Sequence, residues 1–167
     1  MKCEGCGYDF ERVDTADVPT RLRAVAAEHL ALLACATDER LRRRPEEGVW
    51  SPLEYSCHVR DVFLNLRDRI LLALVEDRPV FAPIHREERV HLARYDGEPP
   101  ARVALGIEVG AELLAWLVAG LDARQLARVG VYAGVERDVS WIARQADHEA
   151  THHLLDARRG LGAGAPL

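Results

Sequence analysis

Residues 50–61 read WSPLEYSCHVRD and contain the clearest helix start in the chain. Ser51 and Glu54 have the spacing of a capping box, and Pro52 stands at the first helical position, where its missing N–H costs nothing. Apolar residues then recur every three or four positions towards Glu76, as one buried helix face requires. The stretch therefore predicts a long amphipathic helix over about 52–76, with His58 on the inward stripe.

Three more helices are predicted on either side of this one. The first runs over about 17–38, with Asp17 as N-cap and Pro19 in its first turn. Another runs from about 101 to 121, and the last from 141 to about 159, capped by Ser140. The proline-rich segment 77–100 is a long connection with a short helix over 86–94, and residues 126–140 alternate weakly as in a small hairpin.

Together these elements predict an all-α fold, an antiparallel four-helix bundle with a long connection between its second and third helices. Residues 1–16 form a cysteine-bearing lead-in, residues 17–160 form the bundle, and residues 161–167 form a flexible tail. A length of 167 residues suits one domain.

Composition excludes several classes of protein. The formal net charge of −5 argues against nucleic-acid binding, which favours a basic face. No stretch is long and apolar enough for a membrane span, and the N-terminus lacks the apolar core of a signal peptide. We therefore expect a cytoplasmic protein that binds neither nucleic acid nor membrane, with cysteines as thiols or ligands and not as a disulfide framework.

The last helix contains a histidine run, residues 148–153, which read HEATHH. Positions four apart share a helix face, so His148 and His152 can hold one ion. The run matches the HExxH motif of zinc proteases, but no further histidine or acidic ligand follows at the expected spacing. The third ligand should come from upstream.

His58 fits that role by its level in the bundle. It lies about seven residues, or roughly 10 Å, inside its helix, and His152 lies about as far from the end of the last helix. If the two helices are antiparallel, the sequence predicts one divalent metal on His58, His148 and His152. Zinc is the first candidate, and nickel, iron and copper also suit histidine ligands. Three hydrogen-bonded core histidines are the alternative.

Two neighbours of this set have open roles. Glu149 is either a catalytic general base, as in zinc proteases, or a solvated or supporting acid. His153 follows the ligand pair but is turned away from it, so it could replace His152 only through a change of register. Asp156, one turn beyond His152, can orient that ring or form a surface salt bridge. His29 lies on an apolar stripe and is expected in the core.

The lead-in carries Cys3 and Cys6, which form half of a zinc knuckle. A second zinc site, a redox pair and no special role are the three interpretations. Cys35 and Cys57 share a level on the first two helices, so a site of four thiolates would need the lead-in to run back along the first helix.

The Trp50–Asp61 segment resembles the second-helix motif of the DinB-like (DinB/YfiT-type) superfamily, with its Trp-Ser start, its Glu and its His four residues later. The His148-x-x-x-His152 pair matches the family's remaining ligands, and the resemblance covers the chain from residue 17 on. It implies a four-helix bundle with one divalent metal on three histidines, and commonly a homodimer. Known members include maleylpyruvate isomerase and S-transferases that use mycothiol or bacillithiol.

The first functional hypothesis is therefore a metal-dependent S-transferase or isomerase that uses a low-molecular-weight thiol, such as mycothiol, on a small-molecule substrate. The second is a metal-dependent hydrolase that activates water. The third is a non-catalytic module that binds a metal or a small molecule.

Overall fold

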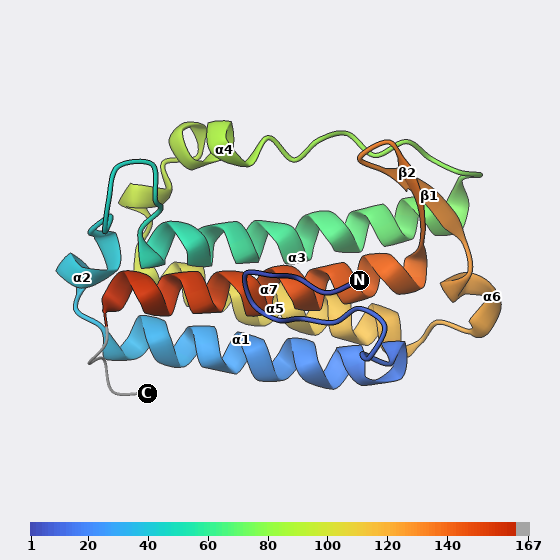
Figure 1. Ribbon diagram of the computed structural model, residues 1–167, viewed down its shortest axis with the longest axis horizontal. Coiled ribbons are helices and arrows are strands. Elements are labelled where there is room, and N and C mark those ends of the chain that lie inside the picture. The colour runs from blue at the N-terminus through green and yellow to red at the C-terminus, as the bar shows by residue number, and fades with distance from the viewer. Residues whose placement is uncertain (163–167) are drawn as a thin grey trace.

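Four long helices form the body of the computed structural model, which describes residues 1–162 (Figure 1). They are α1 (Val18–Cys35), α3 (Pro52–Val75), α5 (Pro100–Ala119) and α7 (Val139–Leu161). Each of α1 and α3 packs against both α5 and α7. The predicted four-helix bundle is therefore confirmed.

The long connection after α3 determines the direction of α5. The chain returns along the outside of the bundle, so α5 starts at the same end as α3 and runs parallel to it (Figure 1). α3 and α7 run antiparallel, as the histidine argument required. The polypeptide between Val75 and Pro100 has the length that a parallel pair of helices needs.

Short elements connect the long ones. The hairpin predicted over 126–140 pairs β1 (Val129–Tyr132) with β2 (Val135–Asp138), and Ala133 and Gly134 in its turn both have positive φ, as tight hairpins require. The remaining short helices are η1 (Thr15–Asp17), α2 (Asp38–Arg42), α4 (Arg86–Leu92), η2 (Tyr95–Gly97) and α6 (Ala123–Leu126).

The capping box at the start of α3 is formed. The Ser51 hydroxyl accepts from the Glu54 N–H at 3.2 Å, and the Glu54 carboxylate accepts from the Ser51 N–H at 2.7 Å. Both side chains are buried. The box fixes the first turn of the helix that carries His58.

We expect Ser51→Ala to lower the free energy of unfolding by roughly 1 kcal/mol, the usual effect of losing an N-cap hydrogen bond. Urea denaturation followed by circular dichroism measures it. An unchanged denaturation midpoint would show that the hydroxyl does not stabilise the helix.

One predicted helix cap was wrong, and another stands at the predicted residue without a side-chain hydrogen bond. Asp138, not Ser140, caps α7: its carboxylate accepts from the Trp141 N–H at 2.6 Å, so the helix starts two residues earlier than expected. Ser140 Oγ instead lies 2.5 Å from Thr15 Oγ1 and ties η1 to α7. Asp17 precedes α1 but makes no side-chain cap hydrogen bond. The tail prediction falls mostly on residues 163–167, outside the described residues.

His29 is a core histidine, as predicted. Its side chain is fully buried, and its Nε2 lies 3.1 Å from the carbonyl oxygen of Ala150 in α7. Burial lowers its pKa from 6.5 to about 4, opposed by this hydrogen bond and reinforced by the nearby His153 and Arg158. The folded protein therefore holds His29 neutral at pH values where the unfolded chain protonates it.

Because the folded-state pKa is depressed, His29 destabilises the fold as pH falls below 6.5 towards 4. We expect the stability of wild type relative to His29→Gln to decrease by about 2 kcal/mol between pH 7 and pH 4.5, since glutamine does not titrate. Parallel denaturation curves at both pH values measure the difference. A difference that does not change with pH would contradict the assignment.

One apolar stripe on α5 is exposed and not packed. It comprises Leu105, Val109, Leu113 and Trp116, and Trp116 is 74% exposed.

No helix in residues 1–162 is long and apolar enough to cross a membrane.

Candidate metal centre

The histidine run on α7 contains two interleaved pairs at a spacing of four residues. His148 and His152 form one pair, and Glu149 and His153 form the other. Each step along an α-helix turns the side chain by about 100°, so the two pairs point in different directions. The structure places them in two clusters of possible ligands, and a third group, His152, His153 and Asp156, joins one residue of each pair.

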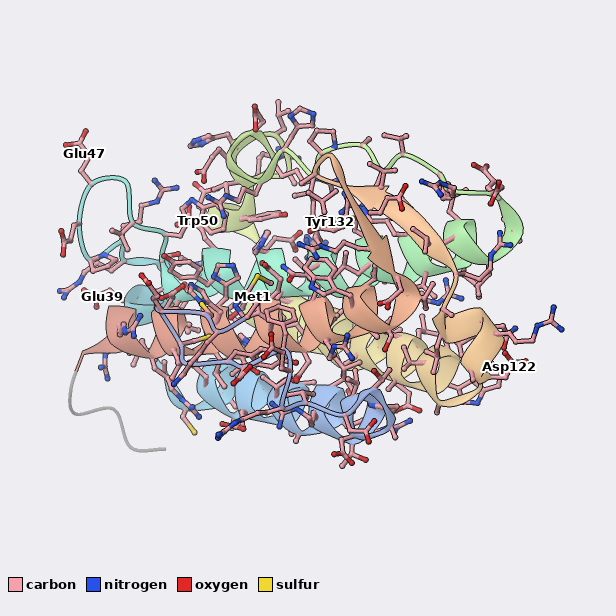
Figure 2. All side chains as sticks on the ribbon, turned by 45° about the vertical axis from the view of Figure 1, so that its right-hand side comes forward. Met1, Glu39, Glu47, Trp50, Asp122 and Tyr132 are labelled. Atoms are coloured by element: carbon pink, nitrogen blue, oxygen red, sulfur yellow. The ribbon has the colours of Figure 1, made fainter. Side chains whose placement is uncertain are left out.

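The first cluster, here called the interhelical cluster, contains His58 from α3 with Glu149 and His153 from α7. Glu149 Oε2 lies 3.7 Å from His58 Nε2 and 3.3 Å from His153 Nε2. All three ligand atoms lie within 4.8 Å of one another. His58 and His153 are buried, and the Trp50 ring packs edge-on against His58. Trp50, which is labelled in Figure 2, stands just before the start of α3, the helix that carries His58.

Neighbouring side chains hold the other atoms of this cluster. The Gln145 amide donates to Glu149 Oε1 at 2.6 Å, which leaves Oε2 towards the two histidines. Asp156 Oδ2 lies 3.1 Å from His153 Nδ1, which leaves Nε2 towards Glu149. Such outer contacts fix the orientation of metal ligands. Asp156 thus orients His153, in addition to its 3.3 Å contact with His152.

The cluster favours positive charge. Burial alone would raise the pKa of Glu149, but its hydrogen bonds with His153 and His58 lower that pKa well below its usual range. Burial lowers the pKa of His58 and keeps its imidazole neutral. Burial also opposes the charging of His153, but hydrogen bonds with Asp156 and Glu149 raise its pKa. The same carboxylates that attract a proton to His153 would attract a divalent cation.

We expect Gln145→Met, which keeps the side-chain volume but removes the donor, to weaken metal binding about 10- to 100-fold, because Glu149 loses its orientation. Competition with a chromogenic chelator measures the affinity. An unchanged affinity would mean that Gln145 does not position the carboxylate.

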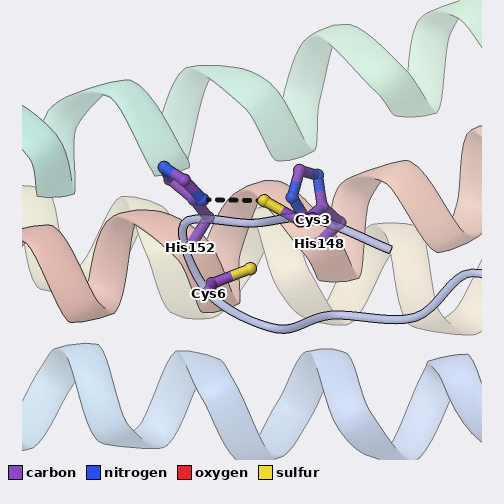
Figure 3. Close-up of side chains that lie close together, drawn as sticks. All are labelled: Cys3, Cys6, His148 and His152. Carbon is purple, nitrogen blue, oxygen red and sulfur yellow. Dashed lines mark hydrogen bonds between the residues drawn. The ribbon is translucent and has the colours of Figure 1, made fainter. Parts of the chain in front are cut away.

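The second cluster, here called the lead-in cluster, contains Cys3 and Cys6 of the lead-in with His148 and His152 (Figure 3). Cys3 Sγ lies 3.5 Å from His152 Nδ1. The lead-in crosses over α7, where the Tyr8 and Phe10 rings pack on His148 at centroid distances of 5.3 and 5.2 Å.

The three histidines predicted as one ligand set are therefore divided. The structure brings His148 and His152 together and places His58 with Glu149 and His153, so no cluster within residues 1–162 contains all three. The prediction that His58 lies level with the histidine run along the bundle axis was accurate to about one residue. A shift of one residue, however, places a side chain on a different face of the helix. His153, set aside as turned away, is the inward-facing residue.

A signal for His153 was present in the sequence. Ala146, Ala150 and Ala157 form the fully buried stripe of α7, and His153 lies between the last two at spacings of three and four residues. His152 falls outside this stripe and is partly exposed.

The other two cysteines do not join the lead-in. Cys35 is exposed near the end of α1, and Cys57 is buried in α3, with its thiol 3.9 Å from the carbonyl oxygen of Tyr95. Neither belongs to a cluster of possible ligands among the described residues. The lead-in runs along α7 and not along α1, so the four-thiolate site is not assembled.

The fold and these clusters define a helical bundle that brings possible metal ligands together between antiparallel helices. A model of the DinB superfamily matches residues 21–157, and the chain belongs to this superfamily. The chain is 32% identical over 148 residues to BH0277 of Halalkalibacterium halodurans, which is named as a candidate metal-dependent hydrolase. The match spans 86% of this chain and 80% of that protein.

Two solved structures share the fold. YfiT from Bacillus subtilis, described as a probable metal-dependent hydrolase with an unusual four-helix bundle topology, superimposes with a TM-score of 0.81 at 17% identity, over 90% of this chain and 89% of that one. A mycothiol-dependent maleylpyruvate isomerase superimposes with a TM-score of 0.72 at 18% identity, over 95% of this chain and 65% of that one.

Proposed function

We propose that this chain is a divalent-metal-dependent enzyme that acts on a small molecule, with the metal held by His58, Glu149 and His153. The observation that carries the proposal is the interhelical cluster, whose ligand atoms lie within 4.8 Å of one another. Two histidines and one acidic residue are a known donor set of catalytic zinc sites, in which a further position stays open. The name of the relative BH0277 also supports metal dependence.

The residues of the cluster fit a divalent ion. His58 is neutral because burial lowers its pKa, and Glu149 is ionised. The second nitrogen of His58, Nδ1, is buried without a hydrogen-bond partner, so packing against Trp50 holds the ring while its Nε2 faces Glu149. Gln145 and Asp156 orient the other two ligands.

A divalent ion in this site would lower the pKa of a coordinated thiol or water and so supply a nucleophile at neutral pH. The chain's own residues set the conditions. Glu149 contributes one negative charge, and the Trp50 ring covers one side of His58. Asp156 holds the His153 ring by its far nitrogen.

The first reaction that we propose is thiol-dependent: S-transfer or isomerisation with a mycothiol-type thiol. The shared fold of the mycothiol-dependent isomerase supports it. Hydrolysis is the second candidate. Because Glu149 and not a third neutral histidine belongs to the cluster, the site carries less positive charge than a three-histidine shell, which weakens its preference for an anionic thiolate over water.

Cobalt-substituted protein distinguishes these reactions. Mycothiol, or a short analogue, is titrated into the cobalt form of Cys3→Ser/Cys6→Ser, which lacks the thiols of the lead-in, while the near-ultraviolet and visible spectrum is recorded. Hydrolysis of a simple ester is followed in parallel. For the thiol reaction we expect a new charge-transfer band and no ester hydrolysis. Ester turnover without any thiol effect would establish the hydrolase. If neither is seen and the metal has no open position, the enzyme proposal fails and the chain is a binding module.

A homodimer, which the superfamily resemblance implies, remains a proposal. The exposed stripe on α5 around Trp116 is the apolar surface that such a contact would cover.

A further inference from the structure

We infer that the chain carries a second metal site, a structural zinc centre in the lead-in cluster, formed by Cys3, Cys6, His148 and His152. The zinc would fasten the N-terminal lead-in to α7. Each of these four side chains offers one ligand atom, and the four atoms lie within 4.8 Å of one another (Figure 3). Two thiolates and two imidazoles are a donor set of structural zinc sites.

The spacing of the donors suits a tetrahedral ion. Zinc–sulfur bonds of about 2.3 Å and zinc–nitrogen bonds of about 2.0 Å at a tetrahedral angle place a thiolate sulfur and an imidazole nitrogen about 3.5 Å apart. Cys3 Sγ and His152 Nδ1 lie 3.5 Å apart. With four protein ligands the coordination shell is closed, so the site is structural, whereas the three ligands of the interhelical cluster leave a position open.

His148 supplies independent support. Both of its ring nitrogens are buried, and neither has a hydrogen-bond partner. A buried polar atom without a partner is destabilising, and native proteins have few of them. A metal ion would account for one of these two nitrogens, and the nearest acid that Nδ1 contacts is Glu149, whose Oε1 lies 3.8 Å away.

The lead-in has the backbone of a metal-binding turn. Gly7 N–H donates to the Cys3 carbonyl at 2.9 Å, and Cys3 N–H donates to the Tyr8 carbonyl at 2.8 Å, so both thiols lie inside one tight turn. Gly7 has a φ of +77°, which favours glycine. At Gly5 a Cβ would lie 2.8 Å from His152 Cε1, so only glycine lets the turn approach the ring this closely.

Contacts outside the site already hold the turn over α7. The Tyr8 hydroxyl donates to Asp147 Oδ2 at 2.8 Å, and the Phe10 ring stacks on Trp141 at 5.6 Å. Arg159 also donates to the Gly5 carbonyl at 3.1 Å. The four ligands are thus brought together by packing, so less conformational entropy is lost when a metal ion binds.

Asp156 connects the two sites. Its Oδ2 lies 3.3 Å from His152 Nε2 and 3.1 Å from His153 Nδ1, so one carboxylate oxygen contacts the outer nitrogen of a ligand in each cluster. The structural zinc would therefore fix His152, and through its contact with Asp156 it would help to fix the carboxylate that positions His153.

The test is metal stoichiometry and cobalt spectroscopy on the full chain, purified under reducing conditions. We expect wild type to bind two equivalents of zinc, and its cobalt form to show a thiolate-to-cobalt charge-transfer band in the near ultraviolet. The Cys3→Ser/Cys6→Ser variant should lose one equivalent of metal and the whole band. His148→Ala keeps both thiols but loses one ligand, so its band should be weaker than that of wild type. Cys35→Ser, which changes an exposed cysteine outside the cluster, is the matched control and should keep both.

The outcomes separate this inference from the proposed function. His58→Ala should bind one equivalent and keep the thiolate band. A wild type with one metal and that band would support the zinc centre and defeat the interhelical site. A reduced wild type without the band, or a band that persists in Cys3→Ser/Cys6→Ser, would overturn the inference. So would a Cys3–Cys6 disulfide that forms equally well in the presence of zinc.

A second measurement does not depend on a variant folding. Alkylation of wild type, followed by mass spectrometry, should modify Cys3 and Cys6 slowly with zinc and rapidly after chelation, while Cys35 reacts at the same rate in both. Equal rates for Cys3 and Cys6 in the two conditions would overturn the inference.

Gly5→Val, which keeps all four ligands, should weaken this protection because its side chain displaces the turn from His152.

Discussion

His153→Ala is expected to abolish metal binding at the interhelical cluster, with a loss of affinity of more than about a hundredfold, since losing a ligand costs more than losing a supporting contact. The ring supplies one of three donors, and His58 is the other histidine of this cluster among the described residues, so no further imidazole of the cluster can replace it. Any metal-dependent activity should be lost with the metal. The measurement is metal content after dialysis against a weak chelator, made in the Cys3→Ser/Cys6→Ser background so that only one site is counted.

His148→Ala is the matched control, because it removes the histidine of the same helix that faces the lead-in. It should leave interhelical binding intact. If His148→Ala loses that metal and His153→Ala keeps it, the ligand set His58, His148 and His152 predicted from the sequence is the true one. If the double cysteine background itself fails to fold, both variants in the wild-type background should bind one equivalent, and the thiolate-to-cobalt band separates them, because His153→Ala should keep its full intensity and His148→Ala should not.

Glu54→Ala should be the most destabilising change at the start of α3. The carboxylate is 3% exposed, accepts from the Ser51 N–H, and is bound by the Arg44 guanidinium at 2.6–3.2 Å. Its removal leaves a buried N–H and a cation without partners, and we expect a loss of about 2–3 kcal/mol of unfolding free energy. Chemical denaturation measures it, with Ser51→Ala as the smaller reference.

The effect should depend on pH. Burial alone would raise the pKa of Glu54, but hydrogen bonds with Arg44 and Ser51 lower it below its ordinary value of 4.5. A carboxyl group with a depressed folded-state pKa stabilises the fold above its unfolded pKa, and this contribution is lost as pH falls further. The difference between wild type and Glu54→Ala should therefore shrink below pH 4.5. Glu54→Gln, which keeps an oxygen for Ser51, should cost less than Glu54→Ala at neutral pH. Equal losses would show that the charge of Arg44 dominates.

Local signals were sufficient to predict most of the fold. The Ser51–Glu54 capping box, the 3.6-residue apolar periodicity and the prolines of 77–100 located the four long helices to within about three residues at each end. These signals succeed because a helix start and a buried helix face depend on residues close together in sequence. Trp116 shows the limit: periodicity identifies an apolar face, but it does not show whether another element covers it.

The kinds of site residue were also predictable, but not their grouping. The sequence alone determined that α7 carries ligating side chains at a spacing of four residues, that His58 lies at their level, and that a Cys-x-x-Cys turn precedes the bundle. Only the tertiary structure decided that His153 and Glu149 face α3 while His148 and His152 face the lead-in. The physical reason is that adjacent residues differ by about 100° around a helix, so choosing between interleaved pairs requires the rotation of α7 against its neighbours. That rotation, like the position of Cys3 beside His152, is set by packing between residues that lie far apart in the chain, 149 positions for Cys3 and His152, and no local pattern records such contacts.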